Sequence, residues 1–186
     1  RPRTSALPSP PNFGLRKTVS APKSNDSPPQ AGSNAIMFQK PYSEYLRFQA
    51  PILIAMAIVG LLRLVLSIAG QPDSIVRFVS VSAVGFAGIV YYGLRVRPSG
   101  FGSYRHLLPL VFNQGLVANG IAILGIGLAV MGMPNIYDVQ EFRGPFATAE
   151  TTPLQHALAH MFIGTTIGAL IGWGMSCVVM AIFGRP

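Results

Sequence analysis

Two histidines one helical turn apart are the residues whose types and spacing best suit chemistry. His156 and His160 are four positions apart, which places both on one face of a helix, the spacing that helical zinc ligands use. A metal centre would need a third ligand, and the candidates are Glu150, Glu141, Asp138 and Asp73. The alternative is an interfacial anchor or a hydrogen-bonding pair. Because two histidines alone do not make a site, we expect no bound cofactor.

Arg63 is the one charged residue in the apolar segment 48–69. A charge at that depth is costly to expose to lipid, and the same helical face carries Gly60, Ser67 and Gly70. We therefore expect this face to turn inward, where Arg63 would join a polar cluster and contact a loop carboxylate, a backbone carbonyl or an anionic ligand. The alternative is that its long side chain snorkels to the outer lipid phosphates.

Three amide side chains lie inside another apolar segment: Asn113, Gln114 and Asn119. We expect them to form hydrogen bonds across helices, each contributing about 1 kcal/mol. Asn113, Gly120 and Gly127 also recur every seven residues, and a small polar seam of this kind could pack helices or line a permeation path.

A row of small and polar residues recurs every four positions near the C-terminus. Its members are His156, His160, Gly164, Gly168, Gly172 and Ser176. Because small residues let another backbone approach closely, we interpret Gly164, Gly168 and Gly172 as helix-packing positions, within one chain or between protomers. The alternative is a groove for a ligand or a lipid.

The elements that must position these residues are four apolar segments, at about residues 48–69, 74–94, 106–131 and 154–183. The first would give roughly 33 Å of helix, enough to cross a hydrocarbon core of about 30 Å. The sequence therefore predicts an all-α integral membrane bundle of four antiparallel transmembrane helices. None of the four segments contains Asp or Glu, which argues against an ion-coupled carrier built on an intramembrane carboxylate.

Composition and charge support a membrane location. Half of the residues are hydrophobic and 11% are charged, against about a quarter charged in a typical soluble domain. Seven of the fourteen Lys and Arg residues precede Gln49, three lie in the hairpin at 95–106, and Arg185 lies near the end of the chain. The positive-inside rule then places both termini in the cytoplasm. Because these cations flank apolar segments, we expect membrane lipid, and no nucleic acid, as a partner.

Residues 1–36 are rich in Ser, Pro and basic residues and lack an apolar core. We interpret them as a disordered tail, with two readings left open: sequence upstream of a native start at Met37, or a targeting segment.

Three runs of sequence carry a resemblance: RLVLSIAGQPDSIVRF, YYGLRVRPSGFGSYRHLLPL and AHMFIGTTIGALIGW. With them, residues 37–186 resemble small four-span membrane proteins of bacteria to which no function is assigned. The resemblance implies a multi-pass location in a bacterial inner membrane and transfers no site.

Three functional hypotheses follow. The leading one is a non-enzymatic packing or interaction component, as a homo-oligomer or with a membrane-protein partner. The second is a small-solute or lipid transport protein that uses Arg63 and the amide seam. The third is a metal- or haem-binding membrane enzyme that uses the histidines, although ligands four apart on one helix cannot reach both sides of a single haem.

Overall fold

The structure is a computed structural model, and it describes residues 36–137 and 151–184. The interpretation of the tail falls, except for Ile36, outside the described residues, as do the acidic side chains of the loop at 138–150. The described chain begins with a short hairpin of two strands, β1 (Ile36–Met37) and β2 (Lys40–Pro41). Every regular element that the structure describes after that is helical.

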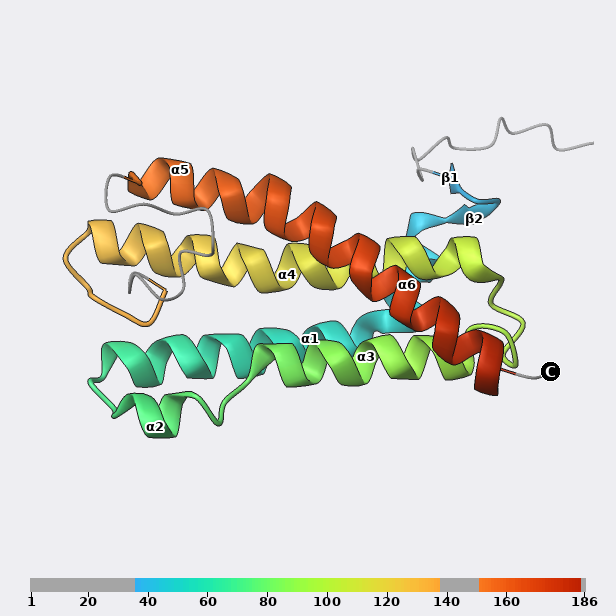
Figure 1. The fold of residues 1–186 in the computed structure, drawn as a ribbon, viewed down its shortest axis with the longest axis horizontal. Helices are drawn as coiled ribbons and strands as arrows, with labels where there is room; N and C mark the ends of the chain where they lie inside the picture. Colours follow the sequence, from blue (N-terminus) through green and yellow to red (C-terminus); the bar gives the residue numbers. More distant parts are fainter. Residues whose placement is uncertain (1–35, 138–150, 185–186) are drawn as a thin grey trace, which may run out of the picture. The chain divides into compact units, whose positions relative to one another are not determined.

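Four long helical segments run side by side and confirm the predicted all-α bundle (Figure 1). They are α1 (Tyr42–Ile68); α2 (Asp73–Val76) with α3 (Val81–Arg95); α4 (Tyr104–Val130); and α5 (Pro153–Leu158), the π-helical segment η2 (Ala159–Gly164) and α6 (Thr165–Phe183). Each of the four is long and apolar enough to cross a membrane. The 27 residues of α1 alone span about 40 Å.

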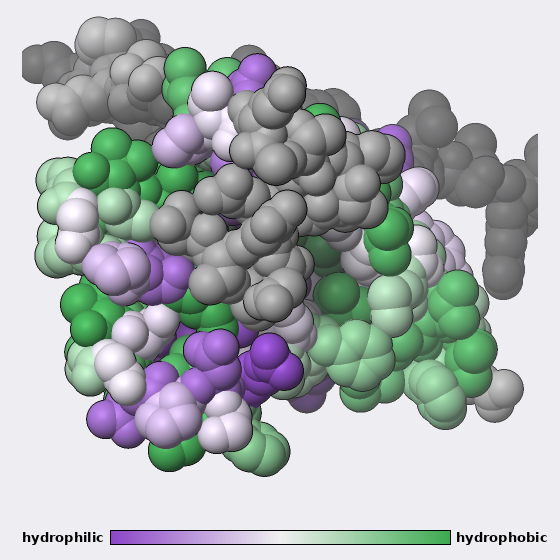
Figure 2. Space-filling view, turned by 60° about the vertical axis from the view of Figure 1, so that its left-hand side comes forward, coloured by the Kyte–Doolittle hydropathy of each residue, from purple (hydrophilic) through white to green (hydrophobic). Residues whose placement is uncertain are grey.

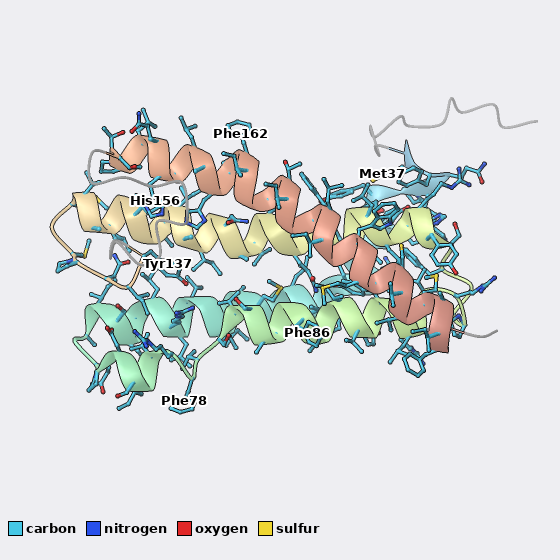
Figure 3. All side chains as sticks on the ribbon, in the orientation of Figure 1. Met37, Phe78, Phe86, Tyr137, His156 and Phe162 are labelled. Atoms are coloured by element: carbon cyan, nitrogen blue, oxygen red, sulfur yellow. The ribbon has the colours of Figure 1, made fainter. Side chains whose placement is uncertain are left out.

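The outer surface of the bundle is apolar along its length. Large side chains such as Ile58 and Val65 are each 61% exposed, and Figure 3 shows Phe86 and Phe162 pointing away from the helices. Figure 2 shows hydrophobic residues over the flank and hydrophilic residues gathered towards the end that carries α2. A soluble surface rarely exposes so much contiguous apolar area, so this chain is a multi-pass membrane protein.

The second span is broken, where the sequence predicted a continuous helix over 74–94. Helix α2 ends at Val76, and α3 begins anew at Val81 because the extended backbone of Ser80 caps it, with the Ser80 hydroxyl accepting a hydrogen bond from the Ala83 amide at 3.2 Å. Val76, the last residue of α2, is buried, while Phe78, between the two helices, is 90% exposed (Figure 3). The end of this span that carries α2 therefore turns away from the bundle axis (Figure 1).

Each helix of the bundle packs on the helices beside it. Helix α4 packs on α1 and α6, and α3 packs on the same two helices. Sequential spans run antiparallel (Figure 1). The end of the bundle that holds the start of α1 also holds the hairpin between α3 and α4 and the end of α6 (Figure 1).

An aromatic core closes that end. Phe101, from the hairpin between α3 and α4, stacks on Phe48 with ring centres 4.2 Å apart and meets Tyr45 edge-on at 5.2 Å. Lys40 also lies over the Phe101 ring, 4.9 Å from its centre, and pairs with Glu44 one turn along. Burial of these aromatic side chains fixes the β1–β2 hairpin against the start of α1.

Candidate functional site

Arg63 lies against the ring of Tyr137. The guanidinium carbon is 5.8 Å from the ring centre, a geometry in which a cation is attracted to the face of the ring. Burial raises the pKa of Tyr137 above its ordinary value, and the nearby Arg63 charge opposes that rise. At neutral pH Tyr137 is therefore an uncharged phenol. The sequence analysis expected Arg63 to contact a loop carboxylate, a backbone carbonyl or an anionic ligand. The structure describes a contact with an aromatic ring.

Residues 131–137 return into the bundle and hold Tyr137 in place (Figure 3). The Asn135 side chain donates a hydrogen bond to the Gly125 carbonyl at 2.8 Å, and the Ile136 amide donates to the Ser67 hydroxyl at 2.7 Å. A Cβ at Gly125 would lie 2.5 Å from the Tyr137 ring. Glycine at this position is what lets the segment pack between α1 and α4.

A chain of hydrogen bonds connects α4 to the histidines of the fourth span. The Asn119 Nδ2 donates to the Gly115 carbonyl at 2.9 Å and to the Thr165 hydroxyl at 3.2 Å. Because a carbonyl can only accept, the Asn119 amide has one possible orientation, and its Oδ1 faces His160 Nδ1 at 2.8 Å. An amide oxygen also only accepts, so Nδ1 of His160 carries a proton.

The second nitrogen of that ring meets the other predicted histidine. In neutral His160 the lone pair is on Nε2, which lies 3.1 Å from Nε2 of His156. The two ring centres are 4.9 Å apart. His156 is buried beside α4 (Figure 3) and His160 is half-buried. The pair predicted from spacing thus comes together, with both Nε2 atoms pointing at one another.

The π-helical segment η2 alters the direction in which the fourth span presents its side chains. The Thr165 backbone N–H and its hydroxyl both bond to the His160 carbonyl, five residues earlier, the hydroxyl at 3.2 Å. The wider turn rotates later residues relative to earlier ones. As a result the buried face continues through Thr165, Ala169, Gly172 and Ser176.

The glycines of the predicted row differ in their surroundings. A Cβ at Gly172 would lie 2.6 Å from Val111 Cγ1, and one at Gly164 would lie 2.9 Å from Asn119 Oδ1, so both glycines sit in close internal contacts. At Gly168 a Cβ would meet no described atom within 4 Å, and the residue is exposed. Within one chain the row is therefore not a continuous packing ridge, and packing between protomers stays a prediction. Its two close contacts are made inside the chain.

The remaining predicted amides, Asn113 and Gln114, are buried. Tyr42 donates its hydroxyl hydrogen to Asn113 Oδ1 at 2.9 Å. The Gln114 side chain lies against Gly88, where a Cβ would clash with it. Neither Asn113 Nδ2 nor Gln114 Nε2 has a hydrogen-bond partner among the described residues. The three amides do not lie together, because Asn119 belongs to the histidine chain and the other two face elsewhere.

An apolar groove of about 490 Å³ opens beside Asn113, and we call it the α4–α6 groove. Its walls come from α4, α6 and the β1–β2 hairpin, and they include Met37, Phe38, Leu108, Phe112, Leu116 and Leu170. Phe38 and Gln39 have φ values of 49° and 71°, which form a tight hairpin turn and place Met37 and Phe38 over the groove. The volume lies within the range of small-molecule sites, about 300–1,000 Å³.

Sequence reasoning missed several of these participants. Thr165 completes the histidine chain and Tyr42 anchors Asn113, yet neither stands out by type or spacing. The groove is built from three segments far apart in sequence, so no local sequence pattern predicts it. The exposed hydrophobic stripe of α4 was the available signal, and in a membrane helix it resembles any lipid-facing surface.

Comparisons with protein-family models, curated proteins and solved structures give no match. Function must be argued from the geometry. Within residues 36–137 and 151–184, no group of three His, Cys, Asp or Glu side chains lies close enough to hold a metal ion.

Proposed function

We propose that this chain is a non-enzymatic multi-pass membrane protein that binds a phospholipid, with an acyl chain held in the α4–α6 groove. The observation that carries the proposal is the groove itself. It is almost wholly apolar, it lies between two helices long enough to span the bilayer, and the hairpin residues Met37 and Phe38 cover one side. The surrounding phase would be lipid, so an acyl chain is the ligand at highest local concentration.

Charge at the mouth of the groove suits a phosphate. Arg105 is exposed and lies on the same stripe of α4 as Leu108, Phe112 and Leu116, which all line the groove. Side chains on a helix lean towards its N-terminus. The Arg105 guanidinium therefore points towards the N-terminal end of α4, at the membrane surface. There it can bind a lipid phosphate while the acyl chain follows the stripe into the membrane.

This proposal joins two of the hypotheses drawn from sequence. The lipid-transport hypothesis is supported in part, because Asn113, one of the predicted amides, lines the groove. A role confined to partner packing loses support, since Gly164 and Gly172 already contact residues of their own chain.

We also propose a bacterial inner membrane as the location, with both termini in the cytoplasm. The support is the sequence resemblance and the placement of cations. Lys40, Arg47 and the exposed Arg95, Arg97 and Arg105 gather at one end of the bundle, and both ends of the described chain are at that same end. Labelling of cysteines placed at Ser99 and Gln71 in a Cys177→Ala background would test it: only the position of Gln71 should react from outside intact cells.

The lipid proposal is tested by filling the groove. Leu170→Trp puts a large ring into it, and the matched control Ile171→Trp puts the same ring on the next residue, which is similarly exposed but does not line the groove (53% and 60%). Each protein is purified in a mild detergent, washed extensively, and its retained phospholipid is quantified by mass spectrometry of the extract.

Wild type and Ile171→Trp should retain phospholipid at a fixed ratio to protein, and Leu170→Trp should lose it. Arg105→Gln should weaken retention by removing the charge that meets the phosphate. Equal retention by the two tryptophan variants, or no retained lipid on wild type, would refute the proposal.

A further inference from the structure

We propose that His156 and His160 together bind a divalent transition metal ion of the kind that imidazole prefers, such as Zn²⁺, Cu²⁺ or Co²⁺. The site is separate from the α4–α6 groove and does not depend on lipid binding.

The first support is the direction of the Nε2 lone pair of His160. The hydrogen bond to Asn119 fixes the His160 proton on Nδ1, which leaves the Nε2 lone pair facing His156. A metal that entered between the rings would displace the proton shared by the two Nε2 atoms. That proton moves to Nδ1 of His156, so both rings stay neutral and both present Nε2 to the ion.

The second support is distance. Two nitrogen ligands on a tetrahedral metal, each at about 2.0–2.1 Å from it, are roughly 3.3 Å apart. The Nε2 atoms of His156 and His160 are already 3.1 Å apart. The Nε2–Nε2 distance therefore needs to change by only a few tenths of an ångström, while the two rings tilt so that both lone pairs converge on the ion.

The third support is independent of the pair and concerns the neighbouring helix. Histidines that bind metals usually donate their other ring N–H to an oxygen that orients the ring. Asn119 Oδ1 plays this role for His160, and the Asn119 amide is itself held by Gly115 and Thr165. The ring orientation that a metal requires thus exists before any ion arrives.

The place of the pair in the span suits an ion that completes its coordination with water. His156 follows Pro153, the first residue of the fourth span, by three residues, about 4.5 Å along the helix. The fourth span has 31 residues, about 46 Å of helix, and so exceeds the hydrocarbon thickness. Its first turns therefore reach the hydrated interface. Because no third His, Cys, Asp or Glu side chain of the described residues joins the pair, water would complete the coordination in place of a third protein ligand, which makes the site exchangeable.

The experiment uses the full chain without a polyhistidine tag, purified in detergent and titrated with Co²⁺ or Zn²⁺ in equilibrium dialysis. Wild type should bind one ion per chain, and Co²⁺ should give visible absorption. His156→Gln and His160→Gln should each abolish stoichiometric binding. The control His106→Gln changes a histidine at the opposite end, where it caps α4 through Ser103, and should bind as wild type does.

Asn119→Leu should keep the stoichiometry but weaken the affinity about 10- to 100-fold, the usual effect of losing an orienting partner. If the histidine variants misfold, Cu²⁺ electron paramagnetic resonance on wild type decides: coupling to two imidazole nitrogens is expected. Absence of stoichiometric metal on wild type, or binding that survives His160→Gln, would overturn the proposal.

Discussion

The side-chain oxygen of Asn119 lies 2.8 Å from Nδ1 of His160, so a residue of α4 determines which nitrogen of a histidine on the neighbouring span carries the proton. The same asparagine bonds to its own helix and to Thr165. Three elements, α4, η2 and α6, are thereby linked through one amide group.

We expect Asn119→Leu to destabilise the fold by about 1–3 kcal/mol, because it leaves the His160 N–H without its acceptor in a partly buried site. Thr165→Val is the matched comparison, since it removes a hydroxyl from the same chain while the Asn119–His160 bond persists. It should cost less. Thermal unfolding in detergent measures both, and an Asn119→Leu variant as stable as wild type would contradict this reading.

The contact between Arg63 and Tyr137 should survive loss of the phenol hydroxyl but not loss of the ring. Tyr137→Phe should therefore leave stability within about 0.5 kcal/mol of wild type, whereas Tyr137→Leu should cost roughly 0.5–2 kcal/mol through the lost cation–π attraction. A double-mutant cycle with Arg63→Met isolates that attraction. A coupling energy of zero would mean that the two side chains are merely adjacent.

Tyr137 also predicts a dependence of stability on pH. Burial raises its pKa in the folded chain above the ordinary value of 10.0, so the folded state holds the phenol proton more tightly than the unfolded state. Stability is then complete below pH 10.0 and falls as pH rises through the raised pKa. Between about pH 8 and about pH 10.5, wild type should lose more unfolding free energy than Tyr137→Phe. An equal loss in both proteins would contradict the assignment.

Two glycines of α6, one buried and one exposed, should respond differently to a large side chain. Gly172→Leu forces atoms into Val111 and Ile89 and should cost about 1–3 kcal/mol, as overpacking does. Gly168→Leu extends into open space beside the bundle and should leave the unfolding temperature unchanged. Equal destabilisation of the two variants would contradict the exposed position of Gly168.

The four spans could be predicted because backbone groups must be satisfied internally where no water is present, and long apolar runs record that requirement. The predicted bounds at 106–131 and 154–183 differ from α4 and from the α5–α6 segment by two residues or fewer. Helix α1 begins at Tyr42, six residues before the predicted start. Composition could not show that polar residues such as Glu44 continue the helix beyond the apolar run.

The parts that could not be predicted depend on tertiary packing. The break before Val81 and the wide turn of η2 are local adjustments of backbone hydrogen bonding, and a hydropathy pattern is nearly the same with or without them. Those adjustments decide which side chains meet. The wide turn, for example, directs Thr165 towards Asn119.

Quenching of tryptophan fluorescence by brominated phospholipid tests the central claim, lipid binding in the α4–α6 groove, most directly. Phe112→Trp places the reporter in the groove, and Phe86→Trp places it on the lipid-facing side of α3 (Figure 3). Trp173, the one native tryptophan, is changed to Phe in both. After exchange from brominated lipid into detergent, the groove reporter should stay quenched by the retained lipid while the α3 reporter recovers. Equal recovery of the two signals would contradict the account.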